Sequence, residues 1–238
     1  KTIVTSANWT MSDIYGDFSH PDSEGNQNNL VQIQSGELAQ AFMTEFNLMW
    51  GDGTIGSPSS QFKARKPARL PVEVSVGKTR IWVQFSPTSQ QQAWEDSSNG
   101  SIGQLLGTSR KRVDLALFVF SEPALGNILQ AQDLKGVKVR GLIDRQFAYR
   151  DYSSALSLMG ADRDDLCQVS QSNLRALDTI GVPTLPRGDL LHHKFAVIDR
   201  QTVITGSHNW SNAANYRNDE TLLVIQDNPT VAAHFDRE

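Results

Sequence analysis

Residues 192–209, which read HHKFAVIDRQTVITGSHN, constrain the fold of this chain more than any other stretch. Successive side chains of a β-strand point to opposite faces, so His192 and Lys194 share one face of the first strand. Asp199 lies an odd number of positions from His192 and faces the other side. The pattern predicts a pair of strands with the imidazole and the ammonium on one side and the carboxylate behind them, in a structural role.

The end of the same stretch adds neutral hydrogen-bonding groups. Gly206 permits a sharp change of backbone direction, after which Ser207 and Asn209 share a face. Lys194 offers a point charge and three donors to the oxygens of a phosphate. The His192 imidazole can attack phosphorus or carry a proton near neutral pH. These groups suit a phosphodiester, and because Lys194 is already the cation, the stretch predicts no metal site.

The spacing H-x-K-x4-D-x6-G-S-x-N resembles the HKD signature of the phospholipase D superfamily, and every specified position matches. The resemblance implies an α/β fold, a phospholipase D-like αβα sandwich in which helices flank a mixed sheet and two repeats are related by a pseudo-twofold axis. It implies metal-independent phosphodiester chemistry through a phosphohistidine, without a cofactor. By the resemblance His192, Lys194 and Glu220 are catalytic, Glu220 hydrogen-bonds the catalytic histidine, and Asp199 and Gly206 are structural positions of the motif.

The start of the chain resembles the end of a second copy of the motif unit. The segment 2–10, TIVTSANWT, matches 203–211, VITGSHNWS, and the segment 28–35, NNLVQIQS, matches 220–227, ETLLVIQD. The loop between the two segments is about nine residues longer in the first copy. We therefore expect an internal repeat with an enlarged loop in its first copy.

The alignment of the two copies assigns further site residues. Asn28 falls opposite Glu220, so the first copy is expected to lack the acidic residue. The serine and asparagine of the motif recur in the first copy and are expected to contact the same phosphate. The residues expected to bind it are Lys194, Ser207, Asn209, Ser6 and Asn8.

The H-x-K of the first copy is expected just upstream of Lys1, since the chain begins without Met and apparently inside a strand. The chain is interpreted as a fragment that holds the end of the first repeat, 1–50, a linker, 51–76, and a complete second repeat, 77–238. In two-copy members of the superfamily one histidine attacks and the other protonates the leaving group. By the resemblance, the missing H-x-K comes from the upstream chain or from a second subunit.

The remaining pattern alternates strands with helices. A helix over 37–50 presents these apolar positions to a core: Leu38, Ala41, Phe42, Phe46 and Met49. Strands are predicted over 80–87, 112–121, 137–144 and 182–185, and helices over 99–111, 122–135, 153–159, 172–180 and from 228 to the end. The linker is rich in Gly, Ser and Pro, which indicates a solvated connector. Its basic residues are Lys63, Arg65, Lys66 and Arg69.

Three further residues near the motif are considered as site residues and are not assigned to the site, although His208 is in a position to line the pocket. Asp144 ends a strand at an edge where ligands often bind, and a helix cap or a loop contact is the favoured interpretation. His193 and His208 occupy variable positions of the motif, and His193 is expected to point away from the phosphate. The ionisable residues of the first-copy loop fit no standard metal site and are interpreted as a polar surface. They are Asp17, His20, Asp22 and Glu24.

Charge and hydropathy limit the choice of substrate. The 238 residues carry a formal net charge of −4, whereas strong non-specific binders of nucleic acid are usually basic. No apolar run is long enough for a membrane span, and no lipid-seeking patch or amphipathic anchor is evident. The sequence narrowly favours a nuclease, with a phospholipase D or cardiolipin-synthase-type lipid enzyme as the alternative. A non-catalytic phosphate-binding scaffold is a further alternative, disfavoured because every motif position is retained.

Overall fold

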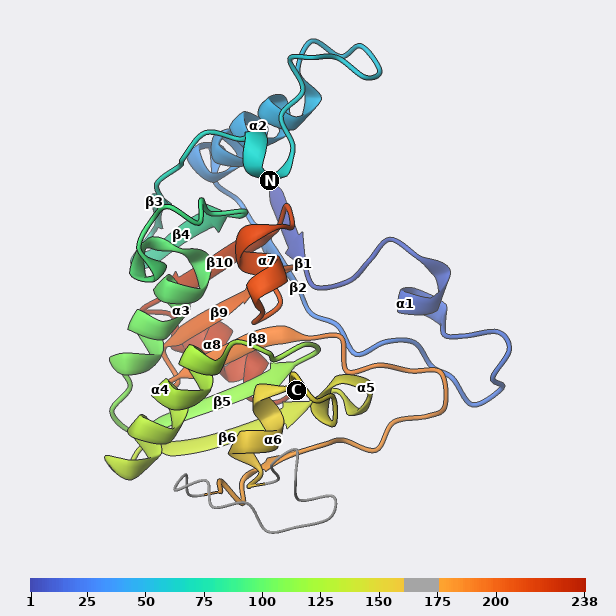
Figure 1. The fold of residues 1–238 in the computed structure, drawn as a ribbon, viewed down its shortest axis with the longest axis vertical. Coiled ribbons are helices and arrows are strands. Elements are labelled where there is room, and N and C mark those ends of the chain that lie inside the picture. The colour runs from blue at the N-terminus through green and yellow to red at the C-terminus, as the bar shows by residue number, and fades with distance from the viewer. Residues whose placement is uncertain (161–175) are drawn as a thin grey trace.

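The computed structural model describes residues 1–160 and 176–238 of the chain. Its centre is an eight-stranded mixed sheet, drawn in Figure 1. The strand order is β3 (Val72–Val76), β4 (Thr79–Phe85), β10 (Thr221–Gln226), β9 (Thr202–Gly206), β8 (Lys194–Ile198), β5 (Arg112–Leu117), β6 (Lys138–Ile143) and β7 (Ile180–Gly181). Neighbouring strands are antiparallel except for β5, β6 and β7, which are parallel. The predicted α/β class with a mixed sheet is confirmed.

Helices pack on both faces of this sheet (Figure 1). One face carries α3 (Ser98–Gly107), α4 (Pro123–Leu134) and α6 (Ser154–Leu158), and the other carries α2 (Gly36–Trp50) and α8 (Pro229–Phe235). In β5, Leu115 and Leu117 enter the first core and Ala116 enters the second. A strand buried on both faces has a continuous apolar sequence, which explains the apolar run at this point of the chain.

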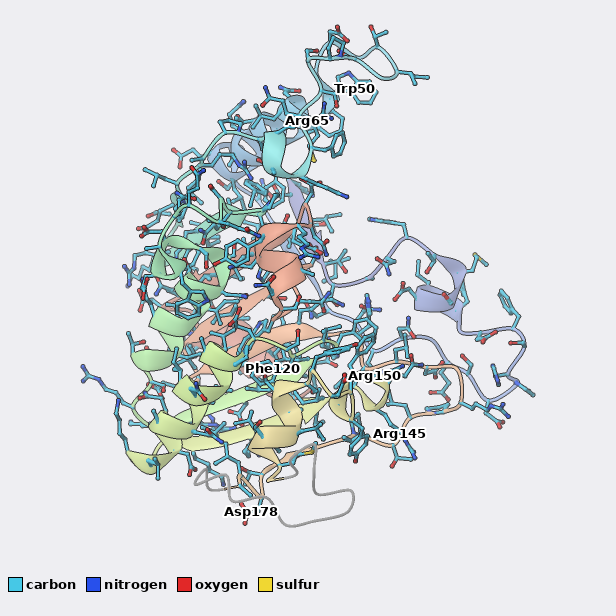
Figure 2. All side chains as sticks on the ribbon, viewed as in Figure 1. Trp50, Arg65, Phe120, Arg145, Arg150 and Asp178 are labelled. Atoms are coloured by element: carbon cyan, nitrogen blue, oxygen red, sulfur yellow. The ribbon has the colours of Figure 1, made fainter. Side chains whose placement is uncertain are left out.

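Several short elements complete the fold. They are β1 (Thr2–Thr5), β2 (Leu30–Ile33), α1 (Met11–Tyr15), α5 (Arg145–Ala148), α7 (Asn212–Tyr216) and two 3₁₀ turns, η1 (Lys63–Arg65) and η2 (Trp94–Asp96). Phe120, which follows β5, lies in the interior with 1% exposure (Figure 2). No helix among the described residues has both the length and the apolar character needed to cross a membrane.

The internal repeat is visible as equal register in two strand pairs. Gly206 of β9 lies opposite Leu222 of β10, and Thr5 of β1 lies opposite Leu30 of β2, at the positions that the sequence alignment equates. The backbone contact that follows each pair is also the same. Ser207 N donates to Thr221 O at 3.1 Å, and in the first copy Ser6 N donates to Asn29 O at 3.1 Å. The two copies therefore share one local structure.

The boundaries of several predicted elements are wrong. Residues 72–76 form β3, an edge strand of the sheet, so the connecting segment is shorter than the predicted linker. Residues 182–185 are not a strand, because the pairing with β6 falls at Ile180–Gly181. The described part of the helix predicted over 172–180 is a turn that leads into β7, and residues 172–175 lie outside the described residues.

The α2 helix buries an acid where apolar residues were predicted. Phe46 is 47% exposed and stacks on Trp50 near the end of the helix, whereas Glu45 is buried. Glu45 forms ion pairs with Lys66 at 2.5 Å and with Arg69 at 2.9 Å. Lys66 is itself buried, so the basic run is not simply a solvated connector. An ion pair between distant segments cannot be inferred from helical periodicity alone.

Candidate active site

The segment just before β8 is clamped by the first copy. His192 N donates to Gln27 O at 2.9 Å, and Gln27 N donates to Leu190 O at 2.8 Å, so residues 26–29 run beside residues 190–193. Asp144 caps α5 through Gln146 N and also accepts a hydrogen bond from Leu191 N at 2.9 Å. The backbone that carries His192 is thereby fixed from two sides.

The His192 ring is buried and contacts the first copy. Its Nδ1 lies 3.1 Å from Oδ1 of Asn28, and it also hydrogen-bonds the backbone of Ser6. The ring packs edge-on against Phe118 with centroids 4.5 Å apart. Burial, and next the charge of Lys194, lower the pKa of His192 to about 4, against the opposing effect of Asp13. The imidazole is therefore neutral at neutral pH.

Lys194 lies beside His192 and also contacts the Phe118 ring. Its Nζ donates to His192 O at 2.6 Å and lies 4.8 Å from the centroid of the Phe118 ring. Burial lowers the pKa of Lys194 to about 7, although the charges of Glu220, Asp13 and Asp144 act to raise it. The site therefore holds an ammonium that is close to its titration point.

Glu220 does not orient His192, so that expectation is wrong. Its carboxylate accepts hydrogen bonds from Asn218 Nδ2, at 3.2 Å, and from the side chain of Ser207. Burial raises its pKa above the ordinary value. The residue that contacts His192 is Asn28, which is the equivalent of Glu220 in the other copy. The physical reason is the clamp between residues 26–29 and 190–193, which brings the first-copy position to the second-copy histidine.

The other predicted phosphate ligands have different surroundings. Ser6 is buried, donates to Asn28 Oδ1 at 2.8 Å and accepts from Asn29 N at 3.0 Å. Ser207 accepts from Thr221 N at 3.0 Å. Within the described residues, Asn209 has a buried Oδ1 without a hydrogen-bond partner. Asn8 is exposed in the loop after β1. Ser6 is thus brought to His192, whereas Asn8 lies on the surface.

Asp199 and Gly206 have architectural contacts. The Asp199 carboxylate accepts hydrogen bonds from three successive backbone N–H groups, those of Arg110, Lys111 and Arg112, at 2.8–2.9 Å. Gly206 has a φ of +128°, and a Cβ there would lie 2.2 Å from Thr221 O. Only glycine fits this position without a shift of the neighbouring strand.

The remaining histidines have partners elsewhere. His193 contacts Asn29 Nδ2 at 3.2 Å and packs on Phe195, on the opposite side of β8 from Lys194. His208 Nε2 lies 2.9 Å from Asn99 Oδ1 in the interior. Among the described residues no group of three or more His, Cys, Asp or Glu side chains is arranged to hold a metal ion.

Two residues of the site were not anticipated. Phe118, just after β5, contacts both His192 and Lys194. Asp13 lies 3.6 Å from His192 Nδ1 and is 6% exposed. The alignment of the two copies could have indicated Asp13, because it places this charged residue opposite Ala214.

Exposed apolar side chains lie on and around α1, a feature that the sequence pattern did not indicate. Figure 1 shows α1 projecting away from the sheet. Trp9 is 83% exposed and Phe18 is 77% exposed. We call this set the α1 patch; its members are Trp9, Met11, Ile14, Tyr15 and Phe18. Met11, Ile14 and Tyr15 lie on the same short helix as Asp13, and Trp9 and Phe18 flank that helix in sequence.

Comparisons with known proteins agree with this geometry. The family described as "Cardiolipin synthase, PLD-like domain" matches residues 102–238. A mitochondrial cardiolipin hydrolase from Mus musculus is 31% identical over 134 residues, which are 56% of this chain and 52% of the relative. The chain therefore spans about half the length of that relative.

Two solved structures share the fold. Nuc, a phospholipase D family member from Salmonella typhimurium, has a TM-score of 0.51 at 22% identity, over 67% of this chain and 91% of that one. Phosphatidylserine synthase from Haemophilus influenzae Rd KW20 has a TM-score of 0.59 at 12% identity, over 99% of this chain and 58% of that one. With its matched motif region and its fold, the chain belongs to the phospholipase D-like family.

Proposed function

We propose that this chain carries half of the active site of a phosphodiesterase in which His192 is the nucleophile. The observation that supports this most is the buried, neutral imidazole whose Nδ1 is engaged by Asn28, next to the Lys194 ammonium. Nε2 is then the nitrogen with the free electron pair. A neutral nucleophile beside a cation that neutralises phosphate oxygens is the arrangement that attack on phosphorus requires.

The proposed reaction has two steps. Nε2 of His192 forms a bond to phosphorus, and the bond from phosphorus to the leaving oxygen breaks. That oxygen keeps the bonding electron pair and takes a proton from a general acid. Water then attacks phosphorus and gives a proton to the group that acted as the general acid, while the N–P bond breaks with its electron pair going to Nε2, so that the imidazole returns to its neutral form. Lys194, with Ser207 and Asn209, stabilises the charge on the phosphoryl oxygens in both steps.

The general acid is proposed to be the histidine of a first-copy H-x-K, from the upstream chain or from a second subunit. The repeat supports this. Asn28 contacts His192 across the two copies, so the equivalent Glu220 is the residue expected to contact the histidine of the other copy. Its raised pKa and its hydrogen bond from Ser207 fit a carboxylate held in a buried site.

The sequence favours nucleic acid narrowly as the substrate, and phospholipid is the second candidate. One observation in the structure supports phospholipid. The α1 patch exposes three aromatic residues, a methionine and an isoleucine on and around the helix that carries Asp13. Exposed apolar patches mark interaction surfaces, and Trp and Phe are common where a protein enters a lipid interface. The chain's net charge of −4 gives no comparable support for binding a polyanion. The preference for nucleic acid rested mainly on the absence of an exposed apolar patch, and the α1 patch removes that argument.

The proposal is tested on the full-length protein in the presence of EDTA. Single-stranded DNA, double-stranded DNA and phosphatidylcholine vesicles are the substrates, and wild type is compared with His192→Asn. Turnover of one substrate by wild type and its loss in the variant support the proposal. Equal activity of the two proteins would remove His192 from the mechanism, and a wild type without turnover would favour the scaffold.

A further inference from the structure

The two copies carry their acidic residue in different places. In the second copy Glu220 has the carboxylate, and the helix position that follows the motif is the buried Ala214. In the first copy the equivalent of Glu220 is the amide Asn28, and the equivalent of Ala214 is Asp13. The surrounding structure is otherwise alike, because each short helix is N-capped by a hydroxyl residue, Thr10 or Ser211. The first copy thus keeps a carboxylate, but carries it on the short helix at Asp13 and not at the position equivalent to Glu220.

The relocated carboxylate is connected to His192 through the amide. Asn28 Nδ2 donates to Asp13 Oδ1 at 2.9 Å and to Asn26 O at 3.3 Å, and both of these atoms accept only. This fixes the orientation of the amide, so Oδ1 faces His192. Oδ1 is an amide oxygen, which accepts from Ser6 Oγ and can only accept, so the ring nitrogen of His192 that faces it must be a donor. His192 Nδ1 therefore carries the proton.

Asp13 is held as an ionised group. Its Oδ1 accepts from Asn26 Nδ2 at 2.9 Å as well as from Asn28, and its Oδ2 accepts from Thr10 Oγ1 at 3.0 Å. Burial acts to raise the pKa of Asp13, but these hydrogen bonds outweigh it and the pKa lies below its ordinary value. A carboxylate with this many donors stays charged close to an imidazole.

From these contacts we propose that Asp13 and Asn28 act together as positioning residues for His192, the amide relaying the charge of Asp13 to Nδ1. The inference rests on the proposed role of His192. When Nε2 bonds to phosphorus, the ring retains the Nδ1 proton and becomes cationic. The negative charge 3.6 Å away and the polarised amide oxygen both stabilise that cation.

Other charged groups around His192 also influence its pKa and that of Lys194, and a pH measurement has to account for them. Lys194, on β8, opposes protonation of the ring, and so does burial. Asp144, which caps α5, acts on Lys194, and Glu220, the residue just before β10, acts on it as well. Asp13 is thus the carboxylate whose charge directly supports the His192 cation.

The first test is Asp13→Asn in the full-length protein, which preserves size and most hydrogen bonds and removes the charge. The pKa of His192, followed by NMR of labelled imidazole nitrogens, is expected to fall by about one unit or more. The value of kcat/KM is expected to fall by about tenfold or more, with KM little changed. Asp22→Asn, an exposed acid of the same loop, is the matched control. An unchanged His192 titration and an unchanged kcat/KM would overturn the proposal.

The second test transfers the arrangement of one copy to the other. Asp13→Ala combined with Asn28→Glu gives the first copy the residue types of the second, and is expected to recover most of the activity that Asp13→Ala alone loses. A folded double variant that recovers no activity would contradict the relay. This test does not need Asp13→Asn, so it still decides the question if Asp13→Asn fails to fold. If His192→Asn removes turnover while both Asp13 tests fail, only this inference falls. If His192→Asn is fully active, the proposed function falls first.

Discussion

Oδ1 of Asn28 lies 3.1 Å from Nδ1 of His192, although the two residues are 164 positions apart in the chain. The contact joins the two copies of the repeat, and it exists because residues 26–29 lie along residues 190–193. The site is thus built between the copies, and predictions about it concern both ends of the chain.

Stability is expected to decrease when the pH is lowered below neutral. Burial lowers the pKa of His192 and of His193 to about 4 and that of His208 to about 3. Between these values and the ordinary value of 6.5 the unfolded chain binds more protons than the folded chain, so stability rises with pH across that window. The raised pKa values of Asp144 and Glu220 act in the opposite direction, and fewer groups are involved.

Urea unfolding at several pH values measures this dependence. The midpoint is expected to fall steadily as the pH decreases from 6.5 toward 4. His234 is exposed near the end of α8, so His234→Gln is a control that should leave the slope unchanged. A midpoint that is flat across this range would show that the buried histidines are protonated in the folded state.

Anion binding is expected to weaken above neutral pH because of Lys194. The pKa of Lys194 is about 7 in the free protein, and the protonated form is the one that attracts an anion. Well above that pH, affinity for tungstate should fall by about tenfold per pH unit, with uptake of a proton on binding. Calorimetry in two buffers measures both quantities. In Lys194→Arg, which stays charged, the profile should be flat; the same slope in both proteins would contradict the assignment.

The buried ion cluster on α2 is expected to matter more for stability than an exposed pair of similar geometry. Lys66 lies 2.5 Å from Glu45 and 2.6 Å from Asp219, with its side chain 1% exposed. Lys66→Met leaves two acids without this partner and should cost about 3–5 kcal/mol of unfolding free energy. Arg80 pairs with Asp227 at 3.1 Å with both side chains about half exposed, and Arg80→Met should cost about 0–1 kcal/mol. Equal losses in denaturant titrations would contradict the burial argument.

The backbone at Gly206 is expected to tolerate no side chain. Its φ of +128° is disfavoured for other residues, and a Cβ would lie 2.2 Å from Thr221 O. Gly206→Ala should therefore lower the unfolding free energy by more than about 1–3 kcal/mol, the cost of strained dihedrals alone. Gly36 begins α2, and a Cβ added there would meet no atom within 4 Å, so Gly36→Ala is the matched control. Thermal unfolding compares the two, and similar melting temperatures would count against this interpretation.

The sequence was sufficient for the fold class, the repeat and the motif strands, because each rests on local patterns. Alternation along 192–198 correctly separates Lys194 from Phe195, and the fixed spacing identifies Gly206. The pairing of His192 with Asn28 was not predictable in this way. It depends on which segments lie side by side in space, and nothing in the local pattern of either segment specifies the other.

Burial of charge was equally hard to predict. Helical periodicity marked Phe46 as a core residue, but Glu45 occupies that face because Lys66 compensates its charge from another segment. Asp13 is a similar case, since its burial depends on amide groups supplied by Asn26 and Asn28. Buried apolar residues can be predicted from the periodicity of their own segment, whereas the burial of a charged residue depends on partners that other segments supply.

The central claim is that His192 forms the covalent intermediate, and trapping that intermediate tests it most directly. The full-length protein is mixed with a phosphodiester labelled at phosphorus, quenched within one turnover under alkaline conditions, and digested for peptide mapping. The label is expected on the peptide that contains His192 and is expected to be absent in His192→Asn. Label on a different residue, or label that survives in His192→Asn, would contradict the account.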